Sequence, residues 1–98
     1  MQTRKQILTK LKSNKNKLIS FGIINVGLFG SYVRNEQTTN SDIDILIDFN
    51  PKNETYDNFI SVYDFLENIF KGDKVEVVTK NGLSPYIGPK ILNEVIYV

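Results

Sequence analysis

The sequence predicts an α+β fold in which helices flank a small mixed sheet of three strands, with residues 1–98 forming one domain. Three observations support this class. Short apolar and β-branched runs recur at three places, and apolar residues at helical spacing lie before and between them. The 98 residues suffice for one hydrophobic core and leave no room for a second domain.

The N-terminal part should form two short helices. Thr3 to Leu11 has apolar residues at helical spacing, with Thr3 available as the N-cap. Asn14 to Phe21 predicts a second helical piece, which Gly22 closes. We expect both helices to serve packing.

Two strands and a connection follow. Ile23 to Phe29 is rich in apolar and β-branched residues and stops at Gly30, which predicts a buried strand. Ser31 to Asn35 should form one helical turn, and Gln37 to Ser41 a polar loop. Ile43 to Phe49 is the apolar run expected of a central strand.

The second half of the chain predicts a helix, a strand and a C-terminal segment. Thr55 or Asn53 should cap the helix, which runs to Phe70. Its expected apolar stripe consists of Tyr56, Phe59, Ile60, Tyr63, Leu66, Ile69 and Phe70. Lys74 to Thr79 is the third strand, and Lys90 to Tyr97 is a last helix or a partly extended tail.

Composition limits the chemistry that this chain can perform. The sequence has no Cys and no His, which excludes disulfides, thiolate or imidazole metal sites, and a His general base. Catalysis must rest on carboxylates, hydroxyls, Lys and Arg. The N-terminus lacks the apolar segment of a signal peptide and no apolar run is long enough to span a membrane, so we expect a cytoplasmic protein without a membrane partner.

Charge is distributed unevenly although the net charge is only +1. The first 35 residues carry seven Lys or Arg and no acid, and all 11 acidic residues lie from Glu36 onward. This basic third is either a surface for a nucleotide, RNA or an acidic partner, or an ordinary solvated helix face. Because no stacking aromatics accompany it, we do not expect direct nucleic-acid binding.

Asp42 and Asp44 form the most informative pair in the sequence. Residues at i and i+2 of a strand point to the same face, while Ile43 and Ile45 point to the other. Two such charges ~5 Å apart repel by roughly 3 kcal/mol at an effective dielectric of ~20, so a compensating cation is expected. Hard carboxylate oxygens suit Mg²⁺, which substrate phosphates and water complete.

Gly30 and Ser31 supply the other half of this candidate site. Glycine lets the backbone approach a phosphate closely, and Ser31 offers its hydroxyl and its N–H at the start of a helical turn. Arg34 lies near the acidic pair and could hold an aspartate or a phosphate with two hydrogen bonds, or form a surface ion pair. A nucleoside triphosphate fits between the two halves.

These residues resemble a known family. Gly30-Ser31, ten residues and Asp42-Ile43-Asp44 match the G-S-x10-D-x-D signature of the DNA polymerase beta-like nucleotidyltransferases. Within them, the chain is similar to the minimal nucleotidyltransferases, which are antitoxins of HEPN-domain toxins. The family usually has Gly where this chain has Asn35, the next most permissive residue for positive φ. The resemblance implies the nucleotidyltransferase fold, with its three strands in the order 1-2-3.

The resemblance also implies a third carboxylate. Glu76 stands where the family has a third Asp, on a strand ~4.8 Å from its neighbour, and would be a metal ligand or a base. Without the motif Glu76 would be read as an exposed strand charge. The implied catalytic and metal-binding residues are Asp42, Asp44 and Glu76, which would hold two Mg²⁺ ions. The implied nucleotide-binding residues are Gly30, Ser31 and Arg34.

By resemblance, the expected function is that of an antitoxin which transfers AMP from ATP to a hydroxyl of its HEPN toxin. Since no acceptor-recognition domain is expected in residues 1–98, the partner would present the acceptor. Two alternatives remain open. The chain could neutralise a partner by binding alone, or it could modify an RNA or a small molecule.

Overall fold

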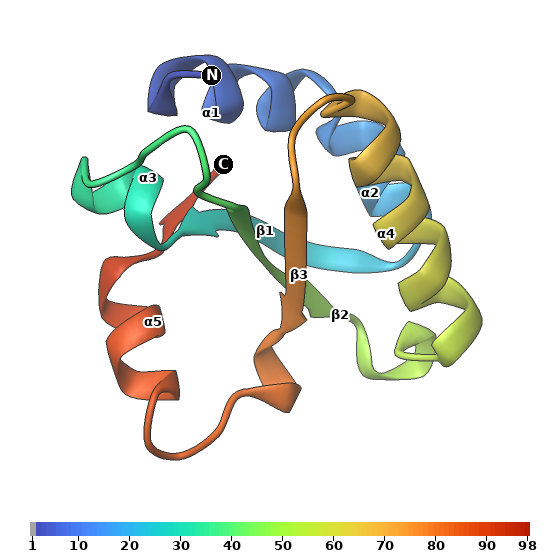
Figure 1. Cartoon of the computed structure of the whole chain (residues 1–98). Coiled ribbons are helices and arrows are strands. Elements are labelled where there is room, and N and C mark those ends of the chain that lie inside the picture. Colours follow the sequence, from blue (N-terminus) through green and yellow to red (C-terminus); the bar gives the residue numbers. More distant parts are fainter. Residues whose placement is uncertain (1) are drawn as a thin grey trace.

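The computed structural model describes residues 2–98, and after two N-terminal helices its strands and helices alternate (Figure 1). The helices and strands, in chain order, are α1 (Arg4–Ser13), α2 (Lys15–Ser20), β1 (Ile23–Phe29), α3 (Ser31–Arg34), β2 (Ile43–Phe49), α4 (Tyr56–Ile69), β3 (Val75–Thr79), α5 (Gly88–Glu94) and β4 (Ile96–Tyr97). Two 3-10 turns, Pro51–Asn53 and Lys80–Gly82, follow β2 and β3. No helix within residues 2–98 is long and apolar enough to cross a membrane.

The sheet is mixed, but it has four strands in the order β3-β2-β1-β4. The expectation of three strands is therefore wrong, while the order of the first three is confirmed. β1 is antiparallel to β2 and β4, and β2 is parallel to β3. The segment expected as one helix or tail divides after Glu94, and its last part pairs with β1. A strand of two residues is too short to leave an alternating pattern in the sequence.

Gly27 explains how β4 can pair with β1. A Cβ atom at Gly27 would lie 2.6 Å from Cγ2 of Val95 and 2.9 Å from the carbonyl oxygen of Ile96. The absence of a side chain thus lets the C-terminal segment approach the sheet. The amide of Val98 also donates to the carbonyl of Val26 at 3.0 Å, which extends the attachment.

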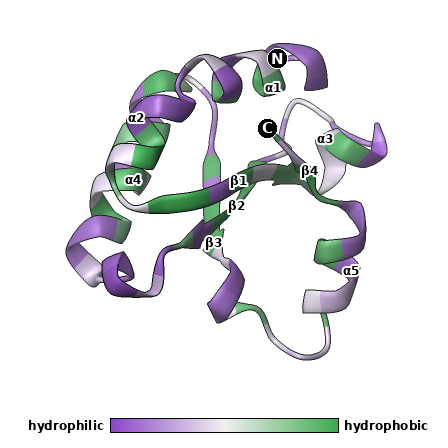
Figure 2. Cartoon of the chain, turned by 180° about the vertical axis from the view of Figure 1, so that it is seen from behind, coloured by the Kyte–Doolittle hydropathy of each residue, from purple (hydrophilic) through white to green (hydrophobic). Residues whose placement is uncertain are grey.

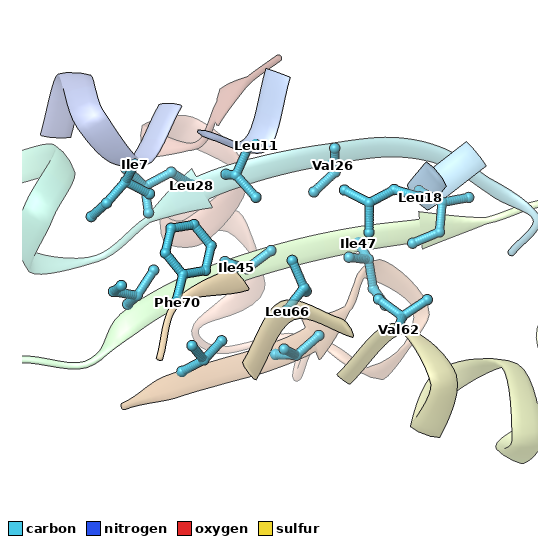
Figure 3. Close-up of a cluster of buried hydrophobic side chains, with 14 of the residues drawn as sticks. Ile7, Leu11, Leu18, Val26, Leu28, Ile45, Ile47, Val62, Leu66 and Phe70 are labelled. Atoms are coloured by element: carbon cyan, nitrogen blue, oxygen red, sulfur yellow. The ribbon is translucent and has the colours of Figure 1, made fainter. Parts of the chain in front are cut away.

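The two faces of the sheet pack against different helices. Figure 1 shows α1, α2 and α4 together on one side of the sheet and α5 on the other. The main core lies on the first side, and Figure 3 shows its buried side chains: Ile7, Leu11, Leu18, Val26, Leu28, Ile45, Ile47, Val62, Leu66 and Phe70. A smaller cluster of Phe29, Leu46 and Ile91 lies on the second side, beneath α5.

The predicted N-caps of α1 and α4 are confirmed. Thr3 caps α1 in a capping box with Gln6, and Thr55 caps α4 by accepting from the amide of Asn58. In Figure 2 the strands are mainly hydrophobic, whereas the helices carry both hydrophilic and hydrophobic residues.

The predicted stripe of α4 is wrong at its first residue. Tyr56 is 78% exposed, whereas Val62, Leu66 and Phe70 are fully buried. Tyr56 is the first residue of α4 and lies six residues, about 9 Å along the helix axis, before Val62, the first buried residue of this row. It therefore lies beyond the buried part of the helix.

Candidate active site

The Gly30-Ser31 turn joins the end of β1 to α3. Gly30 has φ 83° and ψ −155°, a conformation that is essentially restricted to glycine. Its carbonyl accepts hydrogen bonds from the amides of Val33 and Arg34 at 3.0 and 3.2 Å, which starts the helical turn. Asn35 ends α3 with φ 61°, in agreement with its tolerance of positive φ. The turn is thus a tight corner that depends on glycine.

The three predicted carboxylates lie on the sheet face that α5 flanks. Asp42 and Asp44 are partly exposed and alternate with isoleucines buried in the main core. Glu76 of β3 is exposed and lies between two buried valines. The parallel register places Asp44 directly opposite Glu76. The pleat of two neighbouring strands therefore presents all three carboxylates on one side.

Gly30 and Asp44 are in direct contact, which joins the two halves of the motif. The antiparallel register pairs Phe29 with Asp44, so the turn begins beside this carboxylate. A Cβ atom at Gly30 would lie 2.0 Å from Oδ2 of Asp44, far inside any van der Waals distance. Only glycine at position 30 leaves the Asp44 side chain where it is.

Asp44 carries the most perturbed carboxyl of this face. Burial raises its pKa most, and the charge of Glu76, a hydrogen bond with Glu76 and the charge of Asp42 raise it further, to about 7. The guanidinium of Arg34 acts in the opposite direction and lowers the pKa. Burial and the neighbouring negative charges together therefore outweigh the effect of Arg34 on the Asp44 carboxyl.

The donor set fits a hard divalent cation, although the carboxylates do not yet converge. Within residues 2–98, no group of three or more Asp, Glu, His or Cys side chains is arranged so that it could hold a metal ion. Asp44 lies opposite Glu76 in the sheet, and Glu76 and Asp42 are both near enough for their charges to act on Asp44. All donors are carboxylate oxygens, which Mg²⁺ prefers, and a cation would relieve their repulsion.

Arg34 forms ion pairs with two glutamates, in agreement with the surface ion pair that was one of its expected alternatives. Its Nε donates to Glu36 at 2.7 Å, and its Nη1 donates to both carboxylate oxygens of Glu94 at 2.9 and 3.0 Å. Arg34 therefore pairs with two glutamates rather than holding an aspartate. The Glu94 carboxylate also accepts the amide of Gly30 at 2.6 Å. Glu94 is 64 residues from Gly30, and no local pattern in the sequence connects the two.

Two hollows flank the carboxylates. One, of about 240 Å³, is lined by Phe29, Gly30, Arg34, Asp44, Ile87, Lys90, Ile91 and Glu94. The other, of about 400 Å³, is lined by Asp42, Tyr63, Lys74, Val75, Glu76 and Val77. The first is lined by Gly30 and by two basic side chains, Arg34 and Lys90, beside the acidic Asp44 and Glu94. Its glycine and its basic side chains suit a polyphosphate. A larger hollow of about 680 Å³ along α1 contains no motif residue, and we attach no chemistry to it.

We expect Asp44→Asn to stabilise the metal-free protein in a pH-dependent way. Because the folded-state pKa of Asp44 is raised from 3.8 to about 7, the folded state binds the proton more tightly, and stability falls as pH rises from about 4 to 7. Asparagine carries no such charge. After allowance for solvent screening we expect a gain of ~1 kcal/mol at pH 8, or roughly 4–8 °C in Tm, and little gain at pH 4.

Thermal melts in EDTA at both pH values would measure this difference. Asp48→Asn is the matched control, because Asp48 lies on the same strand away from Glu76. An equal gain in Tm at pH 4 and pH 8 would contradict the view that ionised Asp44 destabilises the metal-free protein.

Comparison with known proteins identifies the family of this chain. A family model described as "Nucleotidyltransferase domain" matches residues 4–98. The protein adenylyltransferase MntA of Thermococcus cleftensis is 38% identical over 99 residues, which cover 100% of this chain and 98% of the relative.

Solved structures agree with this assignment. A protein assigned as a minimal nucleotidyltransferase superposes with a TM-score of 0.82 at 25% identity, over 97% of this chain and 95% of the other. A toxin-antitoxin crystal structure with AMP-PNP has a TM-score of 0.63 at 23% identity, over 98% of this chain and 72% of the other, and shares the fold. Since the motif, the fold and the family model coincide, this chain belongs to the nucleotidyltransferase family and resembles its minimal members.

Proposed function

We propose that this protein transfers AMP from ATP to a hydroxyl group of a partner protein, a HEPN-domain toxin, and thereby acts as its antitoxin. The observation that carries the proposal is the direct contact between Gly30 and Asp44, which makes the phosphate-binding turn and the acidic pair one site. The relative MntA is named a protein adenylyltransferase, which supports a protein as the acceptor. AMP-PNP in a neighbouring toxin-antitoxin structure supports ATP as the donor.

The nucleotide would bind at the hollow beside Gly30. Ser31 would donate its hydroxyl to the triphosphate. Arg34 and Lys90, which line this hollow, would neutralise phosphate charge. Asp42, Asp44 and Glu76 would hold Mg²⁺, which supplies charge neutralisation of the triphosphate and activation of the acceptor oxygen when bound.

Glu76 would receive the proton of the acceptor hydroxyl. It is exposed and lies on β3, a strand at one end of the sheet, so an acceptor on another protein can reach it. In the transfer, the acceptor oxygen forms a bond to the α-phosphorus, and the bond from that phosphorus to the bridging oxygen of the β-phosphate breaks. The proton passes to Glu76, and pyrophosphate leaves with the electron pair of the broken bond.

Glu76→Gln should therefore lower the rate of AMP transfer by roughly 10², the scale of general-base assistance. Glu76→Asp keeps the carboxylate and should change the rate only modestly. Single-turnover transfer from labelled ATP to the partner measures both variants. An unchanged rate in Glu76→Gln would show that position 76 is not used.

Mass spectrometry of the partner tests the proposal as a whole. The protein and the product of the neighbouring toxin gene would be purified together and incubated with Mg-ATP. We expect a mass increase of one adenylyl group on the partner. A stable complex that gains no adenylyl group, but in which the toxin is inactive, would instead support neutralisation by binding alone.

A further inference from the structure

The Glu94 carboxylate connects two parts of the candidate nucleotide site. Its Oε2 accepts the amide of Gly30 at 2.6 Å, and both of its oxygens accept from Nη1 of Arg34. One carboxylate thus ties the glycine turn at the end of β1 to the arginine at the end of α3. Figure 1 shows α5, which ends at Glu94, on the same side of the molecule as α3.

Glu94 is held firmly in this position. Its side chain is only 15% exposed, whereas that of Glu36, the other partner of Arg34, is 65% exposed. The next residues are fixed to the sheet, because β4 pairs with Gly27 and Leu28 of β1. The carboxylate is therefore delivered from a backbone that is anchored immediately after it.

The contacts of Glu94 leave part of Arg34 available. Nε and Nη1 are bound to the two glutamates, and within residues 2–98 Nη2 has no hydrogen-bond partner. Arg34 lines the same hollow as Asp44 and acts on the pKa of Asp44. A guanidinium held on two sides with one edge left over is preorganised to bind a further anion.

We propose that Glu94 is a positioning residue for nucleotide binding. It holds the Gly30 amide, and with it the glycine-only backbone of the turn, and it orients Arg34 so that its remaining N–H groups serve the triphosphate. Glu94 acts through these two residues and does not itself contact the nucleotide, since its negative charge would repel phosphate. This inference rests on the proposed function, which places ATP in that hollow.

The first test asks whether the hydrogen bond from the Gly30 amide to the Glu94 carboxylate exists in solution. An amide that donates to a carboxylate at 2.6 Å should have its proton resonance far downfield in the NMR spectrum. Glu94→Gln should move the Gly30 amide proton upfield. Glu36→Gln removes the same charge from Arg34 without touching Gly30, and should leave that resonance in place. An unmoved Gly30 amide in Glu94→Gln would overturn the inference.

The second test measures the effect on the nucleotide. We expect Glu94→Gln to weaken binding of Mg-ATP and raise KM for ATP about tenfold, with kcat changed less than about threefold, because correctly bound nucleotide still reacts. Glu36→Gln should change KM less than about twofold. Glu94→Gln should raise KM less in an Arg34→Ala background than in the unaltered protein, since Arg34→Ala already removes one of the two contacts through which Glu94 acts.

The outcomes separate three explanations. Unchanged or tighter ATP binding in Glu94→Gln would overturn the inference, and tighter binding would show that Glu94 competes with phosphate. If the unaltered protein binds no ATP, both the proposed function and the role of Glu94 in nucleotide binding are wrong. The Gly30 resonance still reports whether the hydrogen bond to Glu94 exists. If Glu94→Gln does not fold, Glu94→Asp keeps the charge but shortens the side chain, and the same comparisons apply with the same expected directions.

Discussion

Replacement of Asp44 by asparagine is expected to reduce AMP transfer by about 10³ or more while the protein stays folded. Asp44 contacts Gly30 and lies opposite Glu76 in the sheet, so it lies at the centre of the candidate site. The variant loses a cation ligand whose charge stabilisation is worth several kcal/mol in the transition state, and each ~1.4 kcal/mol is a factor of ten in rate. Transfer of label from ATP to the partner, with melts in parallel, measures the effect.

The matched control is again Asp48→Asn, which removes the same charge from the same strand. Asp48 pairs with Asn25 near the far end of β2, away from the Gly-Ser turn. We expect this variant to transfer AMP at close to the normal rate. Activity in Asp44→Asn comparable to that of Asp48→Asn would show that the reaction does not depend on the acidic pair.

The local parts of the fold and site could be predicted from the sequence because their signals lie within a few residues. Alternation of Asp42 and Asp44 with isoleucines fixes the face of β2 on which the carboxylates lie, whatever the strand pairs with. The glycine-only corner at Gly30 and the positive φ of Asn35 follow from the motif and from residue type.

The parts that failed depend on contacts between distant segments. β4 is two residues long and exists because Gly27, about 70 residues earlier, leaves space for it. Arg34 forms the surface ion pair that was one expected alternative, but the sequence could not name its partner Glu94, which reaches it from the end of α5. No periodicity or local motif encodes which carboxylate lies nearest an arginine in space.

The raised pKa of Asp44 illustrates the same division. The sequence shows that Asp42 and Asp44 repel one another, yet burial and Glu76 have the larger effects on the Asp44 carboxyl. Both effects come from the packing of β2 between its neighbours, and therefore appear only when the sheet is assembled.

Gly30→Ala is expected to abolish AMP transfer and, with it, protection from the toxin. The new Cβ would lie 2.0 Å from Oδ2 of Asp44, so either the carboxylate or the turn must move. The φ of 83° adds backbone strain of about 1–3 kcal/mol for a residue with a side chain. A displacement of about 1 Å at a catalytic group can reduce the rate by about 10², and here both halves of the site are affected.

Gly72→Ala is the control that distinguishes backbone strain from the steric clash with Asp44. Gly72 also has a positive φ, 91°, but a Cβ atom there would have nothing within 4 Å. Both variants should lose stability, and only Gly30→Ala should lose transfer. If Gly72→Ala were equally inactive, general destabilisation rather than the contact with Asp44 would account for the loss.

The Gly30→Ala variant also distinguishes an enzyme from an antitoxin that acts by binding alone. Position 30 lines a hollow and contacts Asp44, so the change leaves the exposed helical surfaces on which a partner could dock unaltered. Growth rescue on co-expression with the toxin and pull-down of the same pair would be measured together, with Gly72→Ala alongside. We expect Gly30→Ala to bind the toxin without rescuing growth, because the toxin then stays unmodified. Full rescue by this variant would mean that occupation of the toxin surface, and not AMP transfer, neutralises it.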